Sequence, residues 1–370
     1  MKILFTGGGT AGHIFPIIAI IREMKRNYPE SGFEFFYLGP KDKFIKKILS
    51  QEGIEVKTVL AGKLRRYFSF QNIIDVFKIP LGIFQAFYHI FVISPDLIFS
   101  KGGYGSFPTV FSGWLLRTPI FLHESDVSPG LTNKITSRFA LEIFTAFPVE
   151  KTEYFPAQKM IAVGSPIRQK ILTSPVQPEM DFKLAGGKPV ILILGGSQGA
   201  QRINDFILLA LPDLLENFEV IHQTGQANLE QVKKEVRAVI KDDLIKYYHP
   251  EPFLDEEKLS CAYGAADLII SRSGAGTIFE IAALAKPSVL IPLPESAQNH
   301  QVKNGYAFAE DGAALVIEEA NLGPNFFLER LKYLFSQPET LKEMSQKAKE
   351  FSRPQAAEII AGYIFGYLTQ

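Results

Sequence analysis

Short runs of consecutive apolar residues alternate along this chain with stretches in which apolar residues recur every three or four positions. The runs have the length and continuity of strands buried on both faces, and the stretches between them have the period of helices. In the first half, the runs cover residues 2–6, 33–38, 54–60, 96–100, 118–122, 142–145 and 160–163. In the second half, they cover residues 189–194, 219–223, 247–249, 268–270 and 288–291. The alternation predicts an α/β protein whose parallel sheets are covered by helices on both faces.

The sequence of strand, glycine-rich loop and helix starts twice, at residue 2 and again at residue 189. A chain of 370 residues also exceeds what one hydrophobic core usually supports. We therefore expect two Rossmann-like, doubly wound domains, residues 1–164 and 165–354, joined by a passage at 164–168. Their loop edges are expected to face each other across a cleft. The last helix, residues 356–367 within 355–370, is expected to pack back across the domains onto the first one.

Charge and composition narrow the class of protein. Lysine plus arginine and aspartate plus glutamate both number 39, so the formal net charge is zero and no nucleic-acid partner is expected. Cys261 is the single cysteine, which excludes an intramolecular disulfide and fits a reducing compartment. No signal peptide is visible after Met1, and no uncharged apolar run approaches the roughly 20 residues of a membrane-spanning helix. We expect a protein of the cytosol or of the cytosolic face of a membrane.

A glycine-rich turn lies between the run at 268–270 and a helical pattern at 278–284. Glycines at such a turn let the backbone approach a ligand, and the positive end of the helix favours an anion. Glu280 lies about one turn inside the helix, where its carboxylate can accept hydrogen bonds from the vicinal hydroxyls of a ribose. The pattern predicts a nucleotide site with phosphate on the loop. Alternatively, the glycines only make a tight turn and Glu280 caps the helix.

The first glycine loop, after residues 2–6, matches Gly-x-Gly-x-x-Gly at Gly7, Gly9 and Gly12. This pattern is also typical of nicotinamide enzymes. Those enzymes have an acidic residue at the end of the second strand, whereas the run at 33–38 ends in Gly39-Pro40. The dinucleotide interpretation is therefore weakened.

Several polar residues near the two glycine loops are suited to chemistry. His13 stands at the mouth of the first loop, where an imidazole can accept a proton near neutral pH, or else cap the helix. Ser197, in the loop 195–200, offers a hydroxyl to phosphate oxygens. The planar fork of Arg168 suits paired phosphate oxygens. The chain has neither zinc-like Cys/His spacing nor an Asp-x-Asp pair for a metal diphosphate, so no metal or other cofactor is expected.

Residues 63–93 combine a basic start, with Lys63, Arg65 and Arg66, and a dense series of aromatic residues. The helical pattern over 70–93 is interrupted around Pro80-Leu81-Gly82. One interpretation is a core-facing helix pair with a solvated basic end. The aromatics are denser than a core needs, which favours an amphipathic face on an anionic membrane surface.

Taken together, these features resemble the MurG glycosyltransferases of bacterial peptidoglycan synthesis, which have the GT-B fold. The resemblance covers nearly the whole chain. It depends on 7–13 with Pro16, 101–108, 123–134, 164–168, 195–204, 271–280 and His300-Gln301-x-x-Asn304. It implies an inverting transfer of N-acetylglucosamine from UDP-N-acetylglucosamine to the 4-hydroxyl of N-acetylmuramoyl-pentapeptide-pyrophosphoryl-undecaprenol. The enzyme would work as a peripheral protein on the cytoplasmic face of the cell membrane.

The resemblance also implies roles for individual residues. His13 would be the general base, and Tyr104 would face the acceptor. The implied donor-binding residues are Thr10, Ala11, Gly12, Asp126, Arg168, Ser197, Leu254, Ala275, Gly276, Thr277, Ile278, Phe279, Glu280 and Gln301. Among them, Arg168 and Ser197 would face the diphosphate and Leu254 the uracil. Glu280 would hold the ribose and Gln301 would contact the sugar.

Two residues depart from the family's commoner pattern. Ala11 stands where glycine is frequent, and Asp126 stands where asparagine is frequent; a carboxylate lacks the amide's donor hydrogens. The alternatives are a glycosyltransferase of the same fold that acts on diacylglycerol, a UDP-sugar epimerase, a nicotinamide oxidoreductase, and a binding protein in which His13 is structural.

Overall fold

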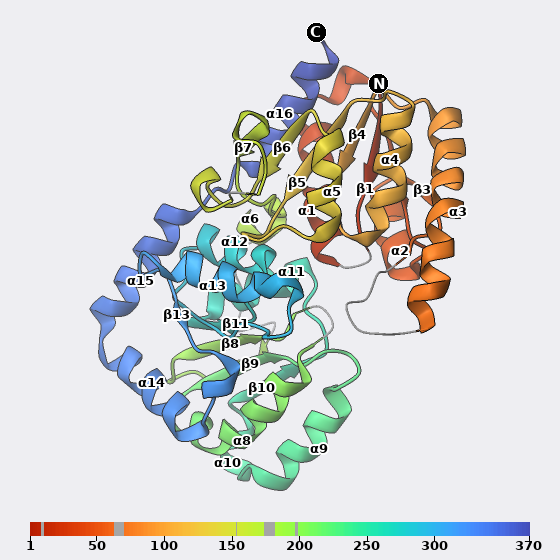
Figure 1. Cartoon of the computed structure of the whole chain (residues 1–370). Helices are drawn as coiled ribbons and strands as arrows, with labels where there is room; N and C mark the ends of the chain where they lie inside the picture. The colour runs from red at the N-terminus through yellow and green to blue at the C-terminus, as the bar shows by residue number, and fades with distance from the viewer. Residues whose placement is uncertain (9–10, 63–69, 153, 174–181, 197–198) are drawn as a thin grey trace. The chain divides into compact units, whose positions relative to one another are not determined.

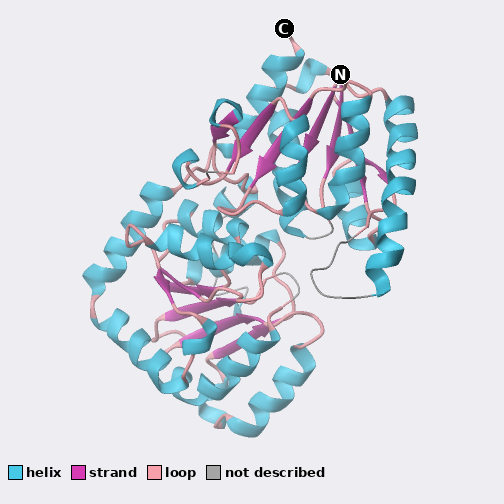
Figure 2. Ribbon diagram, in the orientation of Figure 1, coloured by secondary structure: helices cyan, strands magenta, loops and turns pink. Residues whose placement is uncertain are grey.

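Two parallel sheets, one in each half of the chain, carry the fold (Figures 1 and 2). The computed structural model describes residues 1–370 except 9–10, 63–69, 153, 174–181 and 197–198. The first unit comprises Met1–Arg168 with Pro354–Gln370, and the second comprises Gln169–Arg353. The first unit extends past residue 164 because Ile167 is buried and the Arg168 guanidinium lies 4.0 Å from the ring centre of Phe15. The α/β class with two Rossmann-like sheets is confirmed.

In the first unit, the described strands form a seven-stranded parallel sheet in the order β3-β2-β1-β4-β5-β6-β7. Their bounds are β1 Lys2–Thr6, β2 Glu34–Gly39, β3 Glu55–Thr58, β4 Leu97–Ser100, β5 Ile120–Glu124, β6 Glu142–Thr145 and β7 Met160–Ala162. Strand order reverses between β1 and β4, which is where doubly wound sheets bind ligands at their carboxyl edge. Thr6 pairs with Ser100, so the loops after these two strands emerge side by side.

Alternate residues of β1 enter different cores because successive side chains of a strand point to opposite faces. Ile3 and Phe5 join the core beneath α1 and α16, whereas Leu4 joins the core beneath α3 and α4. The helices of this unit are α1 Ala11–Asn27, α2 Lys43–Gln51, α3 Phe70–Ile93, α4 Phe107–Leu115, α5 Leu131–Thr136 and α16 Ala356–Leu368. Short 3-10 turns include η2 Tyr104–Ser106.

The C-terminal helix α16 returns to the first unit and packs beside α1 (Figure 1). Its buried face includes Ile360 and Ile364. The ring of Tyr363 lies edge-on to Phe144, with 5.3 Å between ring centroids, and its hydroxyl donates to Glu142 Oε1. Helix α16 therefore completes the hydrophobic core of the first unit, although the whole second unit separates it in the sequence from the rest of the first unit.

Helix α3 runs through Pro80 without the predicted interruption. Tertiary packing overrides the local cost of proline, because α3 lies against α4 and the Ser112 hydroxyl donates to the Ile83 carbonyl. Gly82 lets α3 also approach the segment after β3, since a Cβ there would stand 1.9 Å from the Leu60 carbonyl oxygen. The stretch Asp75–Ile93, 19 residues with a mean hydropathy of 1.6, is long and apolar enough to cross a membrane. It includes Asp75 and Lys78, so it is not an uncharged apolar run of the kind whose absence was expected.

In the second unit, the described strands form a six-stranded parallel sheet in the order β10-β9-β8-β11-β12-β13. Their bounds are β8 Val190–Leu194, β9 Glu219–Gln223, β10 Tyr248–Glu251, β11 Leu268–Ser271, β12 Ser288–Leu290 and β13 Leu315–Val316. The helices are α6 Gln169–Thr173, α8 Gln201–Asn217, α9 Leu229–Val239, α10 Asp242–Ile245, α11 Glu256–Ala265, α12 Ala275–Ala283, α13 His300–Ala309, α14 Pro324–Ser336 and α15 Pro338–Phe351. Here the strand order reverses between β8 and β11, so this sheet repeats the winding of the first.

Candidate active site

A cavity of about 320 Å³ opens at the reversal point of the second sheet. Its walls come from the loop after β8 and the start of α8, from the loop after β11 and the start of α12, and from Leu293 and Gln301. Parallel sheets bind ligands in this kind of crevice, beyond the carboxyl ends of the two neighbouring strands between which the strand order reverses. The position of the cavity follows from the β8–β11 pairing, which aligns Leu194 with Ser271.

The backbone of the loop after β8 requires glycine at two of the cavity's lining positions. Gly196 and Gly199 have φ values of 86° and 77°, in the left-handed region that side chains disfavour. A Cβ on Gly199 would also stand 2.4 Å from the Thr224 carbonyl oxygen. On the opposite wall, α12 starts after Gly274, whose lack of a side chain leaves the first amide groups without a side-chain cap. The positive end of this helix favours an anion in the cavity.

Two arginines, Arg202 and Arg272, line the cavity and share the carboxylate of Glu319. Arg272 Nη1 lies 2.6 Å from Glu319 Oε2, and Arg202 Nη1 lies 2.5 Å from Glu319 Oε1. Arg202 Nη2 also donates to Glu295 at 2.7 Å, and this hydrogen bond holds the pKa of the Glu295 carboxyl below its usual range. The cavity therefore carries two guanidinium groups that are already oriented by carboxylates.

Sequence reasoning missed Arg202 and Arg272 and named Arg168 as the cation for a diphosphate. The structure gives Arg168 to the first unit, where it is buried against Phe15. Arg272 directly follows a buried strand and lies inside the glycine turn. This position could have identified it from the sequence as a cation beside the ligand loop. Arg202 carried no comparable signal, because its relation to Arg272 depends on sheet pairing.

Glu280 lies in the second turn of α12, and its Oε2 accepts a hydrogen bond of 2.9 Å from the hydroxyl of Tyr263. Tyr263 is itself buried on α11, so it fixes the direction of a half-buried carboxylate. Of the neighbouring predicted residues, Gly276 is exposed and Thr277 lines the cavity. The side chains of Ala275, Ile278 and Phe279 are buried. These three can meet a ligand only through their backbone.

Gln301 and Leu254 are tied to the loops that surround the cavity. The Gln301 side-chain oxygen accepts from the Leu293 backbone N–H at 3.0 Å, and its carbonyl accepts from the Ser273 hydroxyl at 2.7 Å. The side chain of Leu254 is buried, and its N–H donates to Gln223 Oε1 at 3.1 Å. Gln223 Nε2 donates in turn to the Gly196 carbonyl at 2.8 Å. Gln223, which sequence reasoning also missed, therefore links the Leu254 segment to the glycine loop.

In the first unit, the loops after β1, β4 and β5 share one sheet edge because these strands are neighbours. Gly8 N–H donates to the Gly102 carbonyl at 2.7 Å, and a Cβ on Gly8 would stand 2.8 Å from Gly103 Cα. His13, in the first turn of α1, lies over Gly103, since a Cβ there would be 3.1 Å from His13 Nε2. The absence of a side chain at Gly103 therefore lets the His13 imidazole lie against the loop after β4.

The other predicted residues of the first unit gather at the same edge. Tyr104 starts η2, directly after the loop that His13 touches, and it is half-buried. Asp126 follows β5, and its backbone N–H donates to Glu124 Oε1 at 3.0 Å. Gly12 is exposed in the first turn of α1. Thr10, Ser197 and the side chain of Ala11 lie outside the described residues.

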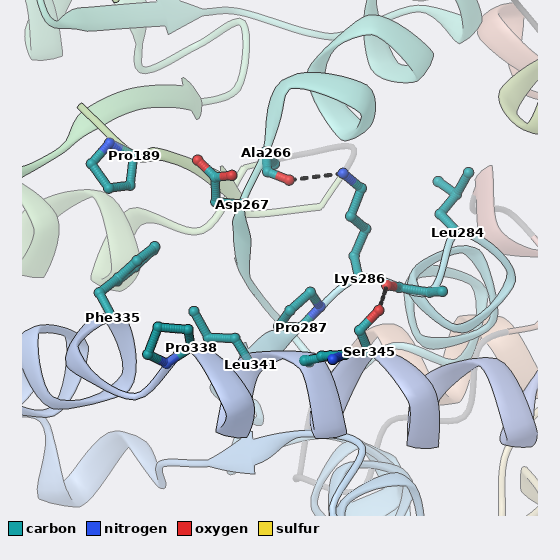
Figure 3. Close-up of a pocket in the computed structure, with 12 residues that line it drawn as sticks. Pro189, Ala266, Asp267, Leu284, Lys286, Pro287, Phe335, Pro338, Leu341 and Ser345 are labelled. Carbon is teal, nitrogen blue, oxygen red and sulfur yellow. Dashed lines mark hydrogen bonds between the residues drawn. The ribbon is translucent and has the colours of Figure 1, made fainter. Parts of the chain in front are cut away.

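A larger hollow, of about 670 Å³, lies at the opposite edge of the second sheet (Figure 3). It is lined by Pro189, Asp267 and Pro287, each of which directly precedes a strand. Lys286 Nζ donates to the Ala266 carbonyl at 2.9 Å, and Ser345 Oγ donates to the Ala285 carbonyl at 2.5 Å (Figure 3). This hollow lies at the amino-terminal edge, whereas parallel sheets bind ligands beyond the carboxyl ends of their strands. Among the described residues, no group of three or more His, Cys, Asp or Glu side chains is placed to hold a metal ion.

Comparison with known proteins defines the class. Residues 3–145 match the glycosyltransferase family 28 N-terminal domain, and residues 190–360 match the glycosyltransferase family 28 C-terminal domain. These two matches cover the two glycine-loop halves described above. The fold and the cavity are therefore those of a glycosyltransferase with two Rossmann-like domains.

Relatives narrow the family further. A Bacillus cereus protein is 37% identical over 365 residues, which cover 98% of this chain and 99% of the relative. It is named UDP-N-acetylglucosamine–N-acetylmuramyl-(pentapeptide) pyrophosphoryl-undecaprenol N-acetylglucosamine transferase 2. The crystal structure of Acinetobacter baumannii MurG is 26% identical, with a TM-score of 0.74 over 99% of both chains. The chain belongs to this MurG family of glycosyltransferases.

A UDP-GlcNAc 2-epimerase from Neisseria meningitidis, solved with UDP-GlcNAc bound, shares the fold of this chain. Its TM-score is 0.69, over 99% of this chain and 100% of the epimerase, at 18% identity. Identity at that level carries the fold alone. The fold by itself therefore does not separate a transferase from an epimerase, whereas the close relatives do.

Proposed function

We propose that the protein transfers N-acetylglucosamine from UDP-N-acetylglucosamine to the 4-hydroxyl of undecaprenyl-pyrophosphoryl-N-acetylmuramoyl-pentapeptide, with inversion at the anomeric carbon. The observation that carries the proposal is the cavity of the second unit, where a glycine loop, a helix start and two arginines converge. Membership of the MurG family supports the identity of both substrates, since that is the reaction named for the Bacillus cereus relative.

The donor would be held by its diphosphate and its ribose. The diphosphate fits the cavity wall made by the loop after β8, the start of α12, and the guanidinium groups of Arg202 and Arg272. Glu280, held by Tyr263, would accept hydrogen bonds from the ribose hydroxyls. Gln301 would contact the sugar, and the backbone at Leu254 would meet the uracil. The buried Leu254 side chain supports a backbone contact there rather than a side-chain contact.

The chemistry needs one base and stabilisation of a departing diphosphate. His13 would take the proton of the acceptor 4-hydroxyl while that oxygen forms a bond to the anomeric carbon and the bond to UDP breaks. The negative charge that develops on UDP would be stabilised by Arg202, Arg272 and the start of α12. Guanidinium groups already oriented by Glu319 need little reorganisation, which is the condition under which such fields lower a barrier most.

The membrane surface would be contacted by one face of α3. Five residues at successive helical turns are exposed on this helix: Phe77, Leu81, Phe84, Tyr88 and Phe91. Ala86 and Ile90, on another face, are buried against the fold. Soluble monomers rarely expose a contiguous apolar patch like this one. The exposed face of α3 therefore favours contact with a lipid surface over a core-facing helix pair. The basic residues 63–66 that precede it, expected to favour anionic lipid, lie outside the described residues.

The proposal is tested by incubating labelled UDP-N-acetylglucosamine with the undecaprenyl-linked precursor and measuring label in the lipid fraction. Parallel reactions contain diacylglycerol or no acceptor. Label in lipid only with the undecaprenyl precursor is the expected result. Label on diacylglycerol would instead identify a glycolipid synthase. Free sugar with UDP, or a rearranged nucleotide sugar, in the reaction without acceptor would identify an epimerase.

A further inference from the structure

Lys101 is a buried lysine at the carboxyl edge of the first sheet, and it has no role in the reaction described above. It directly follows β4, and only 3% of its surface is exposed. Its ammonium group contacts the hydroxyl of Ser125. It also interacts electrostatically with Glu124, the last residue of β5, and with Asp126, in the loop that follows. A charge removed from water is costly unless it is paired, so these carboxylates explain why a lysine is tolerated here.

Glu124 is the buried member of the acidic pair. Its two oxygens accept hydrogen bonds from Asp126 N–H at 3.0 Å and from Asn133 Nδ2 at 2.9 Å. Burial raises the pKa of the Glu124 carboxyl, the neighbouring Asp126 raises it further, and Lys101 lowers it. The second carboxylate, Asp126, is half-buried and belongs to the edge predicted to meet the donor. Without the lysine, the two acidic groups would lose a positive charge that interacts with both of them.

The stem of Lys101 packs beside the His13 loop. A Cβ built on Gly7 would lie 3.4 Å from His13 Cβ and 3.6 Å from Lys101 Cβ, so both side chains contact the same glycine. The backbone N–H of Lys101 donates to the Thr6 carbonyl at 2.9 Å, at the end of the strand that precedes the loop. Lys101 therefore touches the His13 loop with its stem and the loop after β5 with its ammonium group.

We propose that Lys101 is a positioning residue: its ammonium group neutralises the Glu124–Asp126 pair and thereby holds the loop after β5 against the His13 loop. The proposal rests on the proposed function for what binds at this edge, because both substrates carry a diphosphate. Loss of one positive charge beside two carboxylates would make this edge more negative and so less favourable to such a group. Removal of the lysine charge should therefore weaken substrate binding more than it slows the chemical step. If the lysine were purely structural, its removal would change stability without affecting substrate binding more than the chemical step.

The test is a double-mutant cycle in the full-length chain, with K101M, D126N and K101M/D126N. Methionine keeps an unbranched apolar stem, and asparagine is nearly isosteric with aspartate but neutral. We expect K101M to raise the KM for UDP-N-acetylglucosamine about tenfold or more, because the lost charge interacts with both carboxylates. In the D126N background, the same change should raise KM by no more than about threefold. Lys159→Met is the matched control. This half-buried lysine of the same unit directly precedes β7, at the sheet edge opposite Lys101, and donates to the Ala140 carbonyl.

Urea unfolding of the same variants keeps the test independent of activity. If K101M lowers the unfolding midpoint and D126N restores it, the charge pairing is supported even if K101M alone is too unstable to assay. Equal effects of K101M in the two backgrounds, on KM and on the midpoint, would overturn the proposal, as would a double variant that folds no better than K101M. If wild-type protein transfers no sugar to the undecaprenyl precursor, the proposed function fails, whereas the urea cycle still decides the role of Lys101.

Discussion

The hydroxyl of Tyr263, on α11, donates a hydrogen bond of 2.9 Å to Oε2 of Glu280, on α12. The tyrosine ring is buried, whereas the carboxylate is half-buried on α12, the helix that starts at the cavity of the second unit. A buried donor thus aims a partly exposed acceptor. This relationship gives the proposed ribose contact a testable basis.

Tyr263→Phe should weaken UDP-N-acetylglucosamine binding about three- to tenfold, because one hydrogen bond that orients Glu280 is lost while the ring keeps its packing. Glu280→Ala should weaken binding more. Isothermal calorimetry with the donor gives both affinities, and Tyr306→Phe is the matched control, since its hydroxyl bonds the exposed Glu318. Unchanged affinity in the Glu280 variant would contradict the ribose role.

His13→Ala should abolish transfer while UDP binding persists, because the base acts on the acceptor and the nucleotide cavity lies in the other unit. A positioned base contributes about 10²–10⁴-fold to the rate, and a loss of that size is expected in kcat. Transfer kinetics and UDP calorimetry on the same preparation measure the two effects. Normal turnover would exclude His13 as the base.

Arg272→Met should lower kcat about 100-fold, because the guanidinium is buried at the cavity and faces the charge that develops on UDP. Arg202→Met should cost less, since the Arg202 side chain is 53% exposed and water replaces part of its effect. Steady-state kinetics measure both. Arg330→Met, on an exposed arginine over Phe326, controls for loss of charge elsewhere in the unit. An equal loss in the control would remove the specific role.

Replacing Phe84 and Phe91 by serine should reduce binding to anionic vesicles roughly tenfold or more, because each ring is at least 70% exposed and is proposed to enter the lipid interface. Vesicle sedimentation measures the change. Leu209→Ser, on a side chain 73% exposed in the second unit, is the control. Neutralising Arg65 and Arg66 should reduce binding in the same assay and make it less sensitive to salt. If vesicle sedimentation is the same for all of these variants as for the wild type, the membrane role of α3 is contradicted.

The second unit should lose stability as the pH falls below about 6.5, because His222 is buried and neutral. Its ring nitrogens contact the Tyr248 hydroxyl at 2.9 Å and Asn204 Oδ1 at 3.1 Å, and burial lowers its pKa to about 3. The unfolded chain takes up a proton near the ordinary histidine pKa and the folded chain does not, so stability present above that pKa declines toward pH 3. Between pH 7.5 and pH 5 the loss is about 2 kcal/mol.

Urea unfolding at several pH values, compared between wild type and His222→Asn, measures this contribution. The variant should be less stable at neutral pH but should show a smaller decline on acidification. His123, whose pKa burial also holds well below its usual range, adds a decline of the same sign in the first unit. Following each unit by its own fluorescence probe therefore separates the two histidines. An identical pH slope in the variant would show that His222 does not carry the effect.

Local pattern was sufficient for the described strands other than β13, Leu315–Val316, and for the glycine loops beside the cavity. Runs such as Val190–Leu194 are buried on both faces, so continuous hydrophobicity identifies them without knowledge of the fold. Glycine at Gly196 follows from backbone geometry, since its φ of 86° is one that other residues rarely adopt. Local pattern failed at Pro80, where packing of α3 on α4 outweighs the preference of proline to end a helix.

The sequence by itself determined the α/β class, the two glycine-loop halves and the position of Glu280 one turn inside its helix, because each depends on residues close together in the chain. Tertiary structure alone decided the partners of those residues. Arg202 reaches Glu319, and Glu319 reaches Arg272, only because β8, β11, β12 and β13 pair in that order and bring distant loops to one edge. Lys101 likewise meets the acidic loop through the pairing of β4 with β5. Electrostatic partners act through space, and the spacing of residues along a chain does not encode that distance.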